Sequence, residues 1–119
     1  MDSENVPVLL LRNVLIVSVP GDMGDSAIAT LQEQILETLQ RAGAKGVIID
    51  LSTVDIMDSY FARMVIETAQ MINLMGGRTI IAGMLPSVAI TATQLGLMFD
   101  NLETCMDIDE AFTRMENLG

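Results

Sequence analysis

The sequence predicts an α/β fold, with about four helices packed on one mixed, mostly parallel β-sheet of four to five strands. Two observations indicate this class. Short aliphatic runs alternate along the chain with longer amphipathic segments, which is the pattern of strands joined by crossover helices. The chain also has 119 residues, half of them hydrophobic, which suits a single domain over residues 1–119 with its own core.

The first two aliphatic runs predict a β-hairpin. Val8–Leu11 and Val14–Val19 are both strand-like, and only Arg12-Asn13 separates them. Two residues are the length of the tightest hairpin turns. Pro20-Gly21-Asp22 then ends the second strand, because proline and glycine interrupt a regular ladder.

An amphipathic helix is expected next. Asp25 or Ser26 can cap its start by accepting a hydrogen bond from a free backbone N–H, and Gly43 is a suitable residue to end it. The residues that we expect to face the sheet, at helical spacing, are Ile28, Leu31, Ile35, Leu39 and Ala42.

The centre of the chain predicts a buried strand followed by a second helix. Gly46–Leu51 is almost continuously aliphatic, as in strands that are covered on both faces. The polar and acidic loop Ser52–Asp58 leads to a helix that begins near Ser59 and stops at Gly76-Gly77. The inward residues of this helix should be Phe61, Met64, Val65, Thr68, Ile72 and Met75.

Two further strands and a third helix are expected after Gly77. Thr79–Ala82 is another buried strand, and Leu102–Met106 suits a short edge strand. Between them, Pro86 suits the first turn of a helix and Gly96 suits its end.

The chain closes with a predicted fourth helix. Asp107 and Glu110 form a capping-box-like pair at its start. Its inward residues should be Ile108, Ala111, Phe112 and Met115. Strands that are separated by helices should run parallel, with right-handed crossovers.

Composition narrows the possible functions. The net charge is −10 with only six basic residues, so nucleic acid and acidic membrane surfaces are unfavourable partners. A basic protein would be attracted, and solubility is an equally good explanation of the charge. No apolar run approaches the ~20 residues of a membrane-spanning helix. The single cysteine, Cys105, is expected to be a small buried hydrophobe without an internal disulfide, and a cytoplasmic location is expected.

The residues of common active sites are missing from the sequence. Histidine, the commonest general base and metal ligand, does not occur. There is also no Gly-rich phosphate-binding loop, no nucleophile elbow and no calcium-binding loop. We therefore expect no catalytic residue, no metal and no cofactor; an enzyme built only from carboxylates is the weakest alternative.

One segment has the position of a functional site. Asp55–Tyr60 follows the carboxyl end of the central strand and opens a helix, where function usually lies in open α/β sheets. A structural interpretation makes Ser59 or Asp58 the helix N-cap, contributing ~1 kcal/mol. A functional interpretation makes Ser59 a phosphorylation site, because the added charge would lie against the positive end of the helix dipole and leave the helix intact.

Four neighbours of Ser59 are candidate partner contacts. Asp55 and Asp58 are interpreted as capping groups, as surface determinants, or as both. Met57 is interpreted either as core filler, like most of the ten methionines, or as an adaptable contact. Tyr60 either anchors a partner or packs at the helix start. A phosphate on Ser59 would bring bulk and negative charge to all four.

These motifs resemble those of the STAS domain family (sulfate transporter and anti-sigma-factor antagonist) over nearly the full chain. The matching segments are Gly46–Ser52, Val54-Asp55-x-x-Asp58-Ser59, and Gly83-x-x-Pro86-x-Val88-Ala89 leading to Leu95-Gly96. Within the family, the chain is most similar to the stand-alone STAS proteins of the bacterial stressosome, the RsbS type. The resemblance implies a single STAS domain.

The resemblance also implies a non-enzymatic scaffold and regulator of stress signalling. Proteins of this type assemble with RsbR-like STAS paralogues into a large shell that sequesters an RsbT-like serine kinase. Under stress, the kinase would phosphorylate Ser59 and leave to activate a downstream module. An RsbX-like phosphatase would reset the serine. Thr91 falls where some paralogues carry a second phosphorylation site.

Two other functions are compatible with the same residues. A free anti-sigma-factor antagonist is also a STAS domain with a phosphorylatable serine, but it binds an anti-sigma factor directly. A small regulator would instead bind an anion or a nucleotide at the helix N-terminus near Ser59. Particle size in the presence of a paralogue tests the first alternative, and calorimetry with phosphates and nucleotides tests the second.

Overall fold

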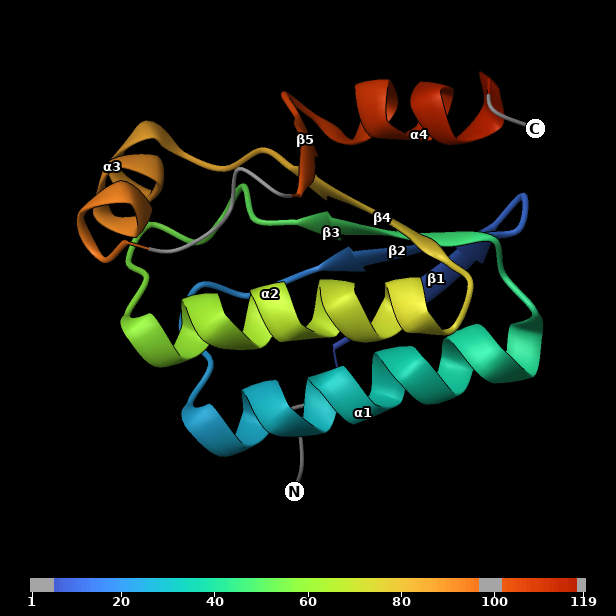
Figure 1. Ribbon diagram of the computed structural model, residues 1–119, viewed down its shortest axis with the longest axis horizontal. Helices are drawn as coiled ribbons and strands as arrows, with labels where there is room; N and C mark the ends of the chain where they lie inside the picture. The colour runs from blue at the N-terminus through green and yellow to red at the C-terminus, as the bar shows by residue number, and fades with distance from the viewer. Residues whose placement is uncertain (1–5, 97–101, 118–119) are drawn as a thin grey trace.

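Strands and helices follow one another in the predicted order in the computed structural model, which describes residues 6–96 and 102–117 (Figure 1). In this part of the chain the elements are β1 (Val8–Leu11), β2 (Val14–Ser18), α1 (Asp25–Ala42), β3 (Gly46–Asp50), α2 (Ser59–Leu74), β4 (Arg78–Ala82), α3 (Pro86–Gln94), β5 (Glu103–Cys105) and α4 (Ile108–Asn117). No helix among these residues has both the length and the apolar character needed to cross a membrane.

The described strands form one sheet in the order β1-β2-β3-β4-β5. β1 pairs antiparallel with β2, and the remaining neighbours pair in parallel, which confirms the mixed, mostly parallel sheet. Arg12 and Asn13 have φ angles of 50° and 68°, as a two-residue turn with left-handed residues requires. Because β2, β3 and β4 share one direction, the loops that leave them emerge at the same edge of the sheet.

Side chains alternate across the sheet and build two cores of unequal size. Figure 1 shows α1 and α2 on one face of the sheet and α4 on the other. The core under α1 and α2 is the larger, and its most deeply buried side chains include Leu15, Val17, Val47, Leu51, Ile72 and Ile81. The core under α4 consists of Val14, Ile48, Ile80, Ala82, Ala111 and Met115. The central strands are therefore covered on both faces, which explains their continuous aliphatic sequence.

Two residues predicted to face inward are exposed, and others are only partly buried. Ala42 is the last residue of α1 and Met75 is the C-cap of α2, and both are exposed. Helical spacing predicts which face of a helix is apolar but not where along its length the packing stops. Cys105 is only partly buried against the α4 core, because β5 is a short edge strand.

The start of α1 also differs from the prediction. Gly24 is the N-cap and makes no side-chain capping bond, so neither Asp25 nor Ser26 has that role. Asp25 is instead the first helical residue, where its charge favours the positive end of the helix dipole. The end of the helix follows the prediction, since Gly43 is left-handed with a φ of 63°.

The remaining boundaries shift by a residue or two. Val19 and Leu51, predicted as strand ends, lie just beyond β2 and β3 but still donate backbone hydrogen bonds to Asp50 O (3.0 Å) and Ala82 O (2.9 Å). The capping pair at the start of α4 is confirmed. The Glu110 N–H donates to Asp107 Oδ1 (2.9 Å), and Glu110 Oε1 accepts from the N–H of Met106 (3.0 Å).

Candidate functional site

The candidate site lies where the β2–α1 and β3–α2 loops meet at the carboxyl edge of the sheet. The Thr53 hydroxyl donates to Val19 O (2.9 Å) and joins the two loops. Gly21 lies directly against the Thr53 carbonyl, so close that a Cβ atom at this position would overlap the carbonyl oxygen. The two loops therefore form one unit, and glycine is required at the point of contact.

Asp50 braces the start of the β3–α2 loop. Its Oδ1 accepts from the Ser52 N–H (3.1 Å), and its Oδ2 accepts from the hydroxyls of Ser52 (3.1 Å) and Ser18 (3.4 Å). Gly83, with a φ of 75°, lies against the same carboxylate. A Cβ atom added to Gly83 would be only 3.1 Å from Asp50 Oδ1. The sequence analysis did not assign this bracing role to Asp50. An acidic residue at the last position of a buried aliphatic strand was the available signal.

Asp58 is the N-cap of α2. Its Oδ1 accepts a hydrogen bond from the Phe61 N–H (2.8 Å), and its backbone carbonyl accepts from Ala62 (3.1 Å). Of the two predicted cap candidates, the structure therefore selects Asp58. Ser59 is the first helical residue and is exposed. Within residues 6–96 and 102–117, its hydroxyl makes no hydrogen bond. The hydroxyl can therefore be modified without disturbing the helix cap.

The predicted partner contacts divide into exposed and buried residues. Asp55 and Asp58 are exposed, and Tyr60 is 38% exposed beside Ser59. Met57 is only 4% exposed and belongs to the large core, which agrees with its interpretation as core filler and not with a surface contact. The preceding residue, Ile56, is 79% exposed and lies on the surface in place of Met57. The spacing of residues in an irregular loop did not reveal which of the two side chains turns inward.

A groove of about 280 Å³ runs beside the start of α2. It is lined by Pro20, Gly21, Asp22, Met23, Asp25, Ile28, Val54, Ile56, Asp58 and Phe61. Three of these residues are aspartates, none is basic, and most of the others are apolar. An apolar floor with an acidic rim suits a partner segment that combines an aliphatic or aromatic side chain with a basic one.

One other predicted site residue, Thr91, lies apart from this groove. Thr91 is on α3, partly buried, and its hydroxyl donates to Ser87 O one turn earlier (3.0 Å). Within the described part of the chain, no three His, Cys, Asp or Glu side chains gather in an arrangement that could hold a metal ion.

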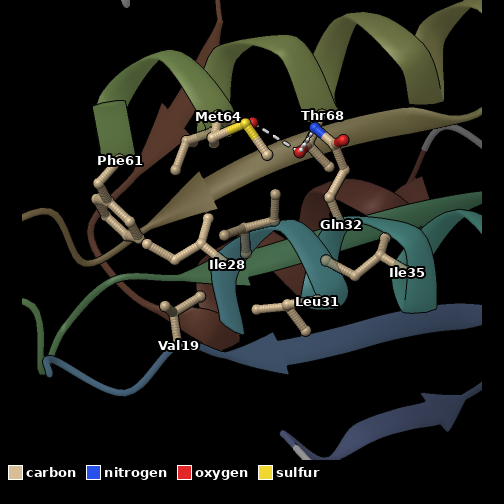
Figure 2. A pocket seen from close by; sticks show the side chains of 10 residues that line it. Val19, Ile28, Leu31, Gln32, Ile35, Phe61, Met64 and Thr68 are labelled. Atoms are coloured by element: carbon tan, nitrogen blue, oxygen red, sulfur yellow. Dashed lines mark hydrogen bonds between the residues drawn. The ribbon is translucent and has the colours of Figure 1, made fainter. Parts of the chain in front are cut away.

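A second, smaller hollow lies between α1 and α2 (Figure 2). Its volume is about 30 Å³, and apolar side chains such as Val19, Leu31 and Phe61 line it. Figure 2 shows Gln32 reaching across to Thr68, with Nε2 donating to Oγ1 (3.0 Å), while the Thr68 hydroxyl donates to Met64 O (2.6 Å). This space is about the size of one water molecule, and the Gln32 and Thr68 side chains that line it are already hydrogen-bonded. It is therefore a packing gap between the helices and not a ligand site.

The comparison with known families identifies the fold. Residues 5–111 match the STAS domain, and the chain belongs to this family. In the described residues of this chain, the STAS domain is thus a mixed five-stranded sheet with four helices.

Individual proteins place the chain near the stressosome group of the family. The RsbT co-antagonist protein RsbRB of Bacillus subtilis is 27% identical over 106 residues, which are 88% of this chain and 38% of that protein. The chain thus spans little more than a third of the length of this curated relative. A structure of Moorella thermoacetica RsbS, in which a serine is replaced by glutamate, has a TM-score of 0.86 at 26% identity and covers 95% of this chain and 96% of that one. A chain from the stressosome, described as a signal integration and transduction hub, has a TM-score of 0.84 at 27% identity and covers 94% and 97%.

Proposed function

We propose that this chain is a non-enzymatic scaffold and regulator of a bacterial stressosome. It holds an RsbT-like serine kinase together with an RsbR-like paralogue, and it releases the kinase when Ser59 is phosphorylated. An RsbX-like phosphatase restores the serine, and the cycle takes place in the cytoplasm. The observation that carries this proposal lies at the start of α2, where Asp58 caps the helix and the exposed Ser59 hydroxyl is not needed for the cap.

The cap geometry supports a modification that leaves the fold in place. Phosphorylating Ser59 breaks no hydrogen bond of the helix start, because the Phe61 N–H is bound by Asp58. The phosphate adds a charge of about −1.5 to −2 near the positive end of the α2 dipole, where negative charge is tolerated. The change therefore acts on the surface.

The surroundings of Ser59 explain how the modification would release a partner. Ile56 and Tyr60 flank the serine with exposed apolar surface, so a bound partner packs closely here. A phosphate inserted into such a contact is bulky and must lose its hydration, which is costly at an apolar interface.

The role of Ser59 is that of a substrate. The sequence contains no histidine, the commonest general base, and the neighbouring Asp58 carboxylate is occupied in capping the Phe61 N–H. The kinase supplies the catalytic groups, and this chain supplies the acceptor oxygen. Thr91 is a candidate second acceptor, although its hydroxyl would first have to give up its bond to Ser87 O.

The similar proteins support the choice of partners. One relative is named a co-antagonist of RsbT, and one similar structure belongs to the stressosome. In the RsbS structure a serine is replaced by glutamate, a substitution that puts negative charge in place of a hydroxyl. These names describe those proteins, and their likeness to this chain motivates the assignment of an RsbT-like kinase and an RsbR-like paralogue here.

Intact-mass measurement after incubation with the RsbT-like kinase and ATP tests the switch. We expect a gain of one phosphate that is lost in Ser59→Ala. Ser87→Ala is the matched control, because Ser87 is also exposed in the first turn of a helix. An active kinase that leaves the chain unmodified, or a phosphate that persists in Ser59→Ala, contradicts the proposal.

Particle size tests the scaffold role separately. Co-expression with the RsbR-like paralogue should give an assembly far larger than either chain. A chain that stays small with every paralogue and binds an anti-sigma factor would support the free antagonist instead. Calorimetric binding of phosphate or nucleotide at the start of α2, abolished by filling the groove, would support the small-ligand regulator.

A further inference from the structure

The Asp50 carboxylate lies where three strand ends meet. Asp50 is the last residue of β3, and in the sheet it is paired with Ser18 at the end of β2 and with Ala82 at the end of β4. The loops that follow these strands begin at this edge of the sheet, and the β3–α2 loop leads to Ser59 (Figure 1). The carboxylate is therefore placed to act on the loop that presents the proposed phosphorylation site.

Three hydrogen bonds converge on this carboxylate. Oδ1 accepts from the Ser52 N–H (3.1 Å), while Oδ2 accepts from the hydroxyls of Ser52 (3.1 Å) and Ser18 (3.4 Å). Two of the three bonds thus hold the first residues of the β3–α2 loop, and the third joins the carboxylate to β2. An ionised carboxylate accepts through both of its oxygens, whereas an amide side chain has a single acceptor oxygen.

Packing leaves the Asp50 side chain little freedom. Gly83, in the turn between β4 and α3, lies against it with a φ of 75°. A Cβ atom added to Gly83 would be 3.1 Å from Asp50 Oδ1 and 3.1 Å from Ser52 Cβ, so a side chain there would press on the carboxylate and on the loop together. The bonds between Asp50 and Ser52 are therefore formed before any partner binds.

The loop that Asp50 braces has an exposed tip between buried residues. Val54 and Met57 are 2% and 4% exposed, whereas Ile56 between them is 79% exposed. The α2 cap fixes the end of this loop, and the bonds to Asp50 fix its start. A partner that binds at Ser59 meets the tip as well. Loss of the brace would let the tip adopt other conformations and leave the helix cap intact.

We propose that Asp50 is a positioning residue for the phosphorylation of Ser59, because it keeps the β3–α2 loop in the conformation that the RsbT-like kinase binds. Its role rests on the function proposed above, and it acts through the loop, not on the reacting atoms. A loosened loop has the binding conformation for only a fraction of the time, and the apparent affinity falls by that fraction. In the bound complex the loop has one conformation, so kcat is unchanged and the effect lies in KM.

Phosphorylation kinetics with the RsbT-like kinase and ATP test this role. Asp50→Ala removes all three hydrogen bonds and should raise the KM for this chain about ten-fold, with kcat within about two-fold of wild type. Ser52→Ala removes one bond within the loop and should raise KM about three-fold. Ser18→Ala is the matched control, because it removes a bond to the same Oδ2 atom but not to the loop, and both constants should stay unchanged.

Backbone amide exchange followed by NMR separates the loop from the rest of the fold. Exchange at residues 52–58 should be about ten-fold faster in Asp50→Ala, while the β3 amides stay as protected as in wild type and in Ser18→Ala. Faster exchange throughout the chain, an unchanged KM, or a loss confined to kcat overturns the role of Asp50. If Asp50→Ala does not fold, equal KM values for Ser52→Ala and Ser18→Ala overturn it.

The wild-type chain separates this role from the proposed function. A wild-type chain that the active kinase leaves unmodified overturns the switch at Ser59 and the role of Asp50 together. A wild-type chain that is phosphorylated on Ser59 with the same KM as Asp50→Ala overturns the role of Asp50 alone.

Discussion

The groove beside α2 and the corner between β5 and α4 use carboxylates in opposite ways. Asp22, Asp25 and Asp58 line the groove without a basic residue among the lining side chains. At the corner, Glu103 lies 2.7 Å from Arg78 Nη2, and Glu110 lies 2.7 Å from Arg114 Nη2. Charge that is neutralised within the chain serves the fold, and charge that is left at a groove is free to meet a partner.

The arginines at the corner also change how its two glutamates bind protons. Hydrogen bonds from Arg78 lower the pKa of Glu103 against the opposing effect of burial, and Arg114 assists. The Met106 N–H and then Arg114 lower the pKa of Glu110. The corner is thus a structural clamp that joins β4, β5 and α4. Variants at the groove and at the corner test whether the carboxylates of the two regions have different roles.

Gly21→Ala should have the largest effect, because it disrupts the contact between the two loops of the groove. The added methyl group overlaps the Thr53 carbonyl, and overpacking of this kind costs about 1–3 kcal/mol of unfolding free energy. Urea denaturation measures the loss. Gly24→Ala is the control, since a Cβ there meets nothing within 4 Å, and only a cost of about 0.5 kcal/mol at an N-cap is expected. Equal losses would show that the loop contact has no special role.

Ser59→Asp should change binding and leave the fold unaffected. We expect the affinity for the RsbT-like kinase to fall by about ten-fold or more, which is about 1.4 kcal/mol. The unfolding free energy should stay within about 0.5 kcal/mol of wild type, as for other exposed positions. Calorimetry and urea denaturation measure the two quantities. Thr113→Asp, exposed on α4, is the control, and a kinase affinity unchanged by Ser59→Asp would contradict the release mechanism.

Asp58→Ala should destabilise the chain by about 1 kcal/mol, because it removes the hydrogen bond to the Phe61 N–H. Asp55→Ala removes the same charge from an exposed position of the same loop and should cost less than about 0.5 kcal/mol. Thermal and urea denaturation of the pair separate the cap from the charge. A smaller loss in Asp58→Ala than in Asp55→Ala would mean that the cap is not the stabilising feature.

Glu103→Gln should have the smallest effect, about 0.5 kcal/mol at pH 7, because both partners of the ion pair are close to one-third exposed. The folded pKa of Glu103 is depressed below its ordinary value of 4.5, so its contribution is present above that pH and is lost as the pH falls through the folded pKa. Wild type and variant should therefore converge in stability once the pH falls below the folded pKa of Glu103. Glu33→Gln on α1 is the control, and a difference that grows on acidification would contradict the assignment.

Much of the fold could be predicted because strand and helix patterns depend on neighbouring residues. The aliphatic run Gly46–Leu51 specified a strand covered on both faces, and Asp107 with Glu110 specified a helix start, as observed. The candidate site was located for the same reason, since Asp55–Tyr60 follows that strand. Which side chains face solvent there was harder to predict. Met57 turned inward and Ile56 outward in a loop without a repeating pattern.

The sequence by itself determined the order of strands and helices, the mostly parallel sheet and the position of Ser59 at the start of α2, because periodicity and capping are local properties. Only the tertiary structure decided which loop lies next to the start of α2. The β2–α1 loop, with Gly21 and Asp22, meets the β3–α2 loop only because β2 and β3 are parallel neighbours. Contacts between residues thirty positions apart depend on how the sheet brings strand ends together, and no local pattern encodes them.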